Sequence, residues 1–157
     1  MSPFMVKQIT TLVGSGDRIG RTALPFLAVG LVANFLRPSW FGVGGPSTAL
    51  KIVSAVMLVP GVIVWLWSVV LILTKVPRGE LITSGPFALV KHPLYTGVSL
   101  LVLPPAGFLL NTWLGLAIGL VVYTAARMYV HAEEEDLERR FGPAWDEYVH
   151  RVLIRWL

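Results

Sequence analysis

The strongest constraint in this sequence is a run of 35 residues, 92–126, that contains no aspartate, glutamate, lysine or arginine. A helix needs about 20 residues to cross a hydrocarbon core about 30 Å thick. The run is too long for one crossing and long enough for two short ones, and Asn111-Thr112 divides it with residues that favour a helix N-terminus. The sequence therefore predicts a tight helical hairpin, with legs at residues 95–110 and 113–130 and a bend or interruption of the first leg at Pro104-Pro105.

Two more apolar stretches precede this run, at residues 22–36 and 49–74. The first is short for a span, but the aliphatic stems of Arg18 and Arg21 extend it. Apolar residues make up 55% of the chain and charged residues only 14%, against about 25% charged residues in a soluble domain. A chain of 157 residues has too little interior to hide so much apolar surface from water. We expect an all-α fold, a polytopic membrane helix bundle with about four transmembrane helices.

The C-terminal segment has a different pattern. Apolar residues recur there at helical spacing, namely Trp145, Tyr148, Val149, Val152, Leu153 and Trp156. This stripe predicts a C-terminal amphipathic helix that packs on the bundle or lies at the membrane interface. We treat residues 1–157 as one membrane domain, with two spans in residues 1–74 and a central loop, the hairpin and the C-terminal helix in residues 75–157.

Basic residues lie mainly on one side of the predicted spans. Four crossings put both termini and the 75–93 loop on the same side, which carries Lys7, Arg18, Arg21, Lys75, Arg78, Lys91, Arg139, Arg140, Arg151 and Arg155. The other side has Arg37, with Lys51 at its edge. The positive-inside rule places the richer side in the cytoplasm. These cations are dispersed, so no nucleic acid partner is expected; membrane lipids are the expected surroundings, and the pattern specifies no oligomeric state.

Two polar clusters meet at one end of the predicted hairpin. Lys91, His92 and Tyr95 open the first leg, and Glu133 and Glu134 follow the second. A His-Pro pair at a helix start and an acidic run after a span are each common structural features. Their position at the two ends of one hairpin favours a binding site.

A charged residue inside the fourth apolar segment is a further candidate for a functional role. Arg127 lies within or at the edge of that span, where a charge is costly and often functional. A structural salt bridge or a side chain reaching toward water explains it equally well. The chain has no cysteine, which excludes a disulfide framework, a thiol nucleophile and a cysteine-metal site, and we predict no metal site.

The polar clusters suit a zwitterionic ligand at the mouth of an apolar cavity. S-adenosylmethionine is one such ligand. Lys91 or His92 would take its carboxylate, Glu133 or Glu134 its ammonium or ribose diol, and Tyr95 would face its sulfonium. Several other zwitterionic ligands would fit the same residues.

Three sequence blocks extend this pattern. They read Leu81-x-x-x-Gly85-x-Phe87, then Lys91-His92-Pro93-Leu94-Tyr95, then Glu133-Glu134-x-x-Leu137-x-x-x-Phe141-Gly142-x-x-Trp145-x-x-Tyr148. In this order and separation, over roughly residues 78–150, the chain resembles the isoprenylcysteine carboxyl methyltransferase and phospholipid methyltransferase family of membrane enzymes.

The resemblance implies an S-adenosylmethionine-dependent methyltransferase that acts on a lipophilic or lipidated substrate by in-line transfer. Carried over by position, the implied cofactor contacts are Leu81, Ile82, Phe87, His92, Pro93, Leu94, Tyr95 and Glu133. Lys91 is added to this set because its positive charge can bind the cofactor carboxylate. Lys91 stands where the family usually has arginine, and Phe87 where tyrosine is common. Tyr129 occupies the place of a substrate-facing arginine in the isoprenylcysteine enzymes, so it is the candidate substrate contact.

Arg127 and Glu134 are the candidate catalytic residues. Arg127 lies two positions from the arginine of the isoprenylcysteine enzymes, a helical rotation of about 200°. A carboxylate acceptor needs no base, whereas an amine needs a proton acceptor, for which Glu133, Glu134 and His131 are candidates.

Two alternatives remain at this stage. Membrane sterol reductases carry a related hairpin and use NADPH, although the block that begins at Glu133 favours methyl transfer. The other alternative is a non-catalytic membrane protein with the same fold. The differences from the usual family residues at Lys91, Phe87 and Tyr129 leave it open. A prenylated cysteine, an amino phospholipid and another small lipophilic acid, amine or thiol all fit as acceptors.

Overall fold

The computed structural model describes residues 15–45 and 47–155, and these residues form helices joined by short loops, without a strand. The helices are α2 (Gly16–Leu36), α3 (Pro38–Phe41), α4 (Thr48–Lys75), η1 (Val76–Arg78), η2 (Gly85–Ala88), α5 (Pro93–Thr96), η3 (Gly97–Val102), α6 (Leu103–Leu109), α7 (Leu114–Phe141) and α8 (Pro143–Arg151). The predicted all-α class is confirmed.

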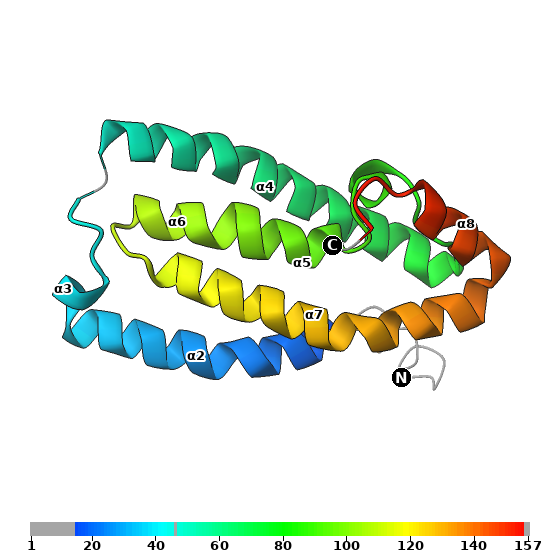
Figure 1. Ribbon diagram of the computed structural model, residues 1–157, viewed down its shortest axis with the longest axis horizontal. Helices are drawn as coiled ribbons and strands as arrows, with labels where there is room; N and C mark the ends of the chain where they lie inside the picture. The colour runs from blue at the N-terminus through cyan, green and yellow to red at the C-terminus, as the bar shows by residue number, and fades with distance from the viewer. Residues whose placement is uncertain (1–14, 46, 156–157) are drawn as a thin grey trace.

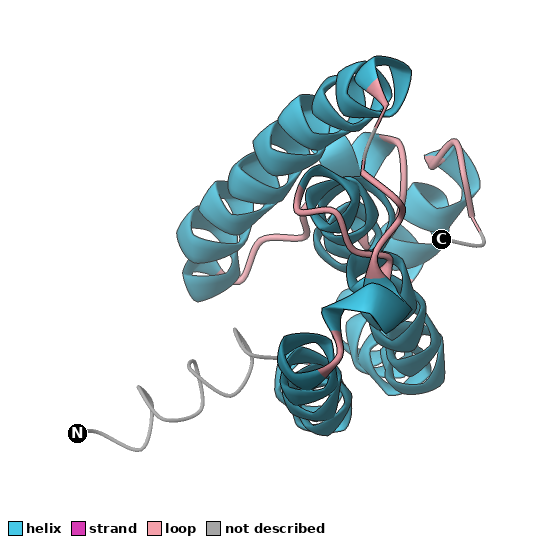
Figure 2. Cartoon of the chain, turned by 90° about the vertical axis from the view of Figure 1, so that its left-hand side faces the viewer, coloured by secondary structure: helices cyan, strands magenta, loops and turns pink. Residues whose placement is uncertain are grey.

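The long helices run side by side (Figure 1). From one side of the bundle to the other the order is α4, the continuous row α5–η3–α6, α7 and α2. The end-on view shows α4 and α2 on the outside of the bundle, with α6 and α7 between them (Figure 2). Three helical segments, Gly16–Leu36, Thr48–Arg78 and Leu114–Phe141, are long and apolar enough to cross a membrane, and Pro93–Leu109 is a shorter apolar helix. This pattern is that of an integral membrane protein. Three of the four predicted spans are long enough to cross a membrane, and the fourth, the first leg of the hairpin, is a shorter apolar helix.

The predicted hairpin is present, with its turn at Asn111 and Thr112. Asn111 adopts a left-handed conformation, with φ of 57°, and the Thr112 hydroxyl accepts a hydrogen bond from the Leu114 N–H at the start of α7. Glycines let the two legs approach closely, because a Cβ added at Gly107 would lie 2.8 Å from the Gly115 Cα. The turn therefore folds through local capping, and the legs close through small residues.

The first leg stays helical through its two prolines, but its winding changes. It consists of α5, the π-helix η3 and α6, and Pro104 and Pro105 lie in the first turn of α6. Prolines have no N–H, so the carbonyls one turn earlier lose their usual helical donors. The change in winding to a π-helix occurs in that preceding turn.

The second leg is longer than predicted. Helix α7 continues past Val130 to Phe141, so Glu133 and Glu134 lie on the helix itself rather than in a segment after it. Its 28 residues make it about 42 Å long at 1.5 Å per residue, whereas the hydrocarbon core is about 30 Å thick. The helix is therefore long enough for its charged final turns to extend beyond the membrane core.

The C-terminal amphipathic helix is shorter than its predicted stripe. Trp145, Tyr148 and Val152 are buried, but α8 ends at Arg151 and Leu153 is 74% exposed. The chain leaves the helix because the N–H groups of the next residues bond to the 85–90 loop instead: Leu153 to the Ala88 carbonyl at 3.3 Å and Ile154 to the Leu89 carbonyl at 2.9 Å. The predicted positions Trp156 and Lys7 lie outside the described residues.

The contact between α4 and the first leg depends on Gly61, which gives a first test. A Cβ at Gly61 would lie 2.6 Å from the Leu101 Cβ, whereas one at Gly20 of α2 would meet nothing within 4 Å. We expect Gly61→Ala to lower the free energy of unfolding by roughly 1–3 kcal/mol through overpacking.

Gly20→Ala is the matched control, because it makes the same change in an open helical position. It should leave the stability unchanged or raise it by up to about 1 kcal/mol. Denaturation in detergent micelles followed by circular dichroism compares the two variants, and equal midpoints would contradict the close packing of α4 on η3.

Candidate active site

A cavity of about 540 Å³ opens at the end of the bundle where α7 projects beyond its neighbours. Its walls come from the start of α2, the end of α4, the 79–92 loop, α5, the last three turns of α7, and α8. This volume lies within the range of small-molecule sites, roughly 300–1,000 Å³. Segments that are far apart in the sequence therefore build one cavity.

Eight of the nine predicted cofactor contacts line this cavity. They are Leu81, Ile82, Phe87, Lys91, His92, Leu94, Tyr95 and Glu133. The ninth, Pro93, is fully buried in the first turn of α5 and is not in the cavity wall. Its ring fixes the start of that helix, because proline is pre-organised for the first helical position. The structure thus brings the predicted set together.

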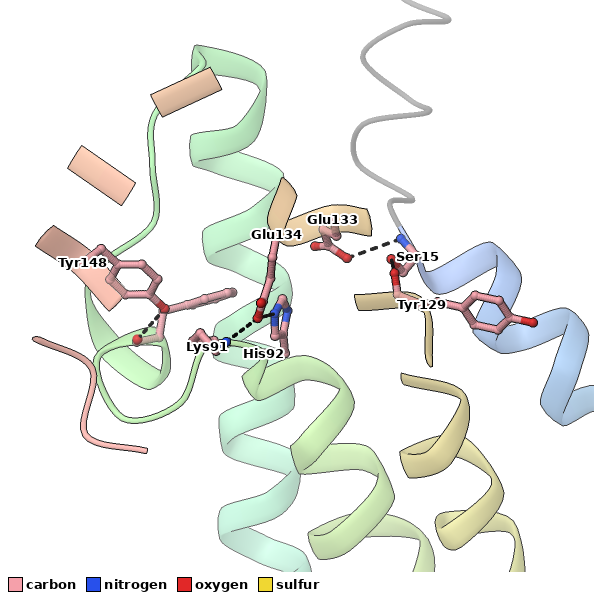
Figure 3. Close-up of polar contacts among 8 residues, drawn as sticks. Ser15, Lys91, His92, Tyr129, Glu133, Glu134 and Tyr148 are labelled. Carbon is pink, nitrogen blue, oxygen red and sulfur yellow. Dashed lines mark hydrogen bonds and ion pairs between the residues drawn. The ribbon is translucent and has the colours of Figure 1, made fainter. Parts of the chain in front are cut away.

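A carboxylate on α7 joins the two ends of the hairpin. Glu134 Oε1 lies 2.5 Å from Lys91 Nζ and 3.1 Å from His92 Nε2, as Figure 3 shows. The three side chains are largely shielded from water, with exposed fractions of 12% for Lys91, 9% for His92 and 23% for Glu134. The predicted meeting of the Lys91-His92 pair and the acidic run is confirmed. Glu134 itself is not among the residues that line the cavity.

The neighbouring Glu133 faces a different side. It lines the cavity, and its Oε2 accepts a hydrogen bond of 3.4 Å from the Ser15 N–H. The buried Ser15 also donates its hydroxyl to the Tyr129 carbonyl at 3.0 Å. These contacts attach the start of α2 to α7 beside Glu133 (Figure 3).

An aromatic wall continues from His92. The Tyr95 ring stacks on the imidazole with 6.2 Å between centroids and an angle of 23° between planes. The Tyr95 hydroxyl points toward α2, where a Cβ added at Gly16 would lie 3.6 Å from it. His92 and Tyr95 therefore present a continuous ring surface that ends at α2.

Arg127 and Tyr129 do not line the cavity. The Tyr129 hydroxyl hydrogen-bonds with Thr22 Oγ1 at 3.2 Å, so it faces α2. Arg127 is exposed on α7. The substrate-binding role predicted for Tyr129 and the catalytic role predicted for Arg127 receive no support from this cavity.

The sequence analysis missed the contribution of α2. Ser15, Gly16 and Arg18 line the cavity, yet no motif marks them and Ser15 lies 118 residues from its partner Glu133. One face of α7 was also not assigned to the site, although two of its residues, Leu137 and Phe141, belong to the acidic sequence block. Asp136, Leu137, Arg140 and Phe141 line the cavity with Glu133, at offsets of three, four, seven and eight residues. That spacing is the signal of a single helical face and was present in the sequence.

Tyr148 of α8 holds the wall of the cavity to the 85–90 loop. Its hydroxyl donates a hydrogen bond of 2.8 Å to the Phe87 carbonyl. Burial, and secondarily the nearby Glu134 carboxylate, raises the pKa of this phenol. Tyr148 therefore keeps its proton, and the donor, through the neutral pH range.

The sequence profile of the isoprenylcysteine carboxyl methyltransferase family matches residues 48–139, more than half of the chain. The chain belongs to this family. It is thus a member of a family of membrane methyltransferases. No curated protein and no solved structure matches the chain. Within this methyltransferase-family chain the matched segment contains α4, the loop, the hairpin and most of α7, whereas α2 and α8 lie outside it.

The bond from Tyr148 to the loop gives a second test. Tyr148→Phe removes the hydroxyl and leaves the Phe87 carbonyl without its donor, so we expect the free energy of unfolding to fall by about 1 kcal/mol. Tyr123→Phe is the control, because Tyr123 is half-buried on α7 and makes no side-chain hydrogen bond in the described structure. Chemical denaturation of both variants measures the difference; equal losses would contradict a specific role for the Tyr148 bond.

Proposed function

We propose that this protein transfers a methyl group from S-adenosylmethionine to a lipophilic acceptor at the membrane surface. Membership of the isoprenylcysteine carboxyl methyltransferase family supports the reaction type. The single observation that carries the proposal is the cavity itself, which gathers the motif residues from both ends of the hairpin at the end of a bundle of apolar helices.

The lining fits the chemical groups of the proposed cofactor. S-adenosylmethionine has a carboxylate, an ammonium, a ribose diol, a sulfonium and an adenine ring. The Lys91 ammonium would bind the carboxylate. Glu133 and the remaining ring nitrogen of His92 would accept hydrogen bonds from the ammonium or the diol. The Tyr95 ring would face the sulfonium. Phe87, Phe141 and Trp145 add apolar aromatic walls for the base.

The protein's own contribution to the chemistry would be alignment and exclusion of water. The sulfonium supplies an already activated methyl group, so holding two reactants in line accounts for most of the acceleration. The acceptor nucleophile attacks the methyl carbon as the carbon–sulfur bond breaks and its electron pair goes to sulfur. A carboxylate acceptor needs no base. For an amine, Glu133, a carboxylate that lines the cavity, is the candidate to receive the proton.

Binding of the cofactor tests this proposal directly. Wild-type protein in detergent should bind S-adenosylmethionine in isothermal titration calorimetry, and Glu133→Gln and His92→Ala should each weaken binding tenfold or more, because charge-assisted hydrogen bonds are worth about 1.5–3 kcal/mol. Glu138→Gln is the matched control on the same helix, since Glu138 is exposed and is not part of the cavity wall.

Two results would contradict the proposal. One is equal affinity in wild type and both site variants, which would remove these residues from the site. The other is binding of NADPH in place of S-adenosylmethionine, which would indicate a reductase. Transfer of a labelled methyl group to a component of a lipid extract, followed by mass spectrometry of the product, would identify the acceptor.

We further propose that the cavity and both termini face the cytoplasm, following the distribution of basic residues. The chain has no cysteine, so single cysteines can report the side. Ser84 before η2 and Ser39 in α3 are both exposed and lie near opposite ends of the bundle (Figure 1). In intact cells a membrane-impermeant maleimide should label Ser39→Cys, and it should label Ser84→Cys only after lysis. The reverse pattern would invert the topology.

A further inference from the structure

We infer that Glu134 is a positioning residue, which holds Lys91 and His92 in the cavity wall and balances the charge of Lys91 without touching the ligand. This inference rests on the proposed cofactor site and assigns a role to a residue that stands behind it. It also separates the two adjacent acids of the motif, since Glu133 faces the cavity and Glu134 does not.

The geometry around one oxygen atom carries the argument. Glu134 Oε1 contacts both Lys91 Nζ, at 2.5 Å, and His92 Nε2, at 3.1 Å. An ionised carboxylate only accepts hydrogen bonds, so the proton of a neutral His92 ring lies on Nε2. The remaining ring nitrogen, Nδ1, is then an acceptor. Glu134 thereby determines which nitrogen of His92 is left to bind other groups.

Burial makes this carboxylate necessary. Lys91 and His92 line the cavity with side chains that are only 12% and 9% exposed. An ammonium group so shielded from water is costly unless a counter-ion compensates it. Among the described residues, Glu134 is the acid within salt-bridge distance of Lys91. Without Glu134, the Lys91 ammonium would be more stable in water than in the cavity wall.

Helix geometry explains why the two adjacent glutamates, Glu133 and Glu134, have different roles. Successive residues of a helix are about 100° apart, so one carboxylate of α7 reaches toward α2 and the cavity while the next reaches toward the Lys91-His92 turn. Glu133 can then contact a ligand. Glu134 acts on the ligand only through Lys91 and His92.

A spectroscopic test reports the pairing without any ligand. In protein with ¹⁵N-labelled histidine, the nitrogen shifts of His92 should show the tautomer with the proton on Nε2, and Glu134→Ala should abolish that preference. The chain has three histidines, and the other two, His131 and His150, are exposed. The spectrum of His92→Ala identifies the signal of interest. Glu138→Ala, the matched control, should leave it unchanged.

A binding cycle separates positioning from direct contact. Glu134→Ala should weaken S-adenosylmethionine binding about tenfold in the wild-type background and have no further effect in a Lys91→Ala, His92→Ala background, because the groups through which it acts are gone. Glu134→Gln, which keeps the shape of the side chain, guards against misfolding and should also weaken binding. Circular dichroism checks that each variant is folded.

Each other outcome overturns the inference. An unchanged His92 tautomer in Glu134→Ala would show that the carboxylate does not orient the ring. A full tenfold loss in the double-variant background would show that Glu134 contacts the ligand itself. Failure of the wild-type protein to bind S-adenosylmethionine would instead overturn the proposed function, and with it the cofactor role of Glu134. The spectroscopic test of the Glu134–His92 pair needs no ligand, so its result stands independently of this failure.

Discussion

The close approach of the hairpin legs is the constraint on which the site depends. In a hydrocarbon environment backbone groups must be satisfied within the protein, which favours helices and makes packing between them depend on small residues. Gly107 and Gly115 face each other across the turn, and a Cβ at Gly119 would crowd the Pro104 ring at 3.3 Å. These contacts place α5 beside α7, and only with that pairing does the Lys91-His92 turn lie next to Glu134.

The length of α7 sets how the two acids are held. A helix that ended at the edge of the apolar segment would leave Glu133 and Glu134 in a loop, without a fixed direction. Because the helix continues, the two acids have defined orientations about 100° apart. The helix is also longer than a hydrocarbon core is thick, and the cavity lies beside its last three turns.

The sequence predicted those parts of the structure that depend on local pattern. The hairpin followed from one uncharged run, and its turn from Asn111 and Thr112. Pro104 and Pro105 marked the leg whose winding changes, although they do not interrupt the helix. The joined polar clusters followed from the hairpin. The wall formed by Ser15 of α2 did not follow, because it is a contact with Glu133 across 118 positions and its backbone N–H group carries no residue signature. The prediction that Leu153 lies on the helical stripe was wrong for a related reason. Backbone hydrogen bonds to the 85–90 loop replace the helix that the spacing of Leu153 indicated.

The family profile matches only part of the chain that builds the cavity. The segment that matches the family supplies Lys91, His92 and Glu133 on a rigid hairpin. The start of α2, outside that segment, completes the cavity wall beside Glu133 and contacts Tyr129 with both Ser15 and Thr22. The cavity wall therefore includes two parts, a hairpin that the family profile matches and the start of a helix that it does not match. Because α2 is joined to α7 at Glu133 and Tyr129, the two parts are held together by direct hydrogen bonds rather than by the connecting chain alone.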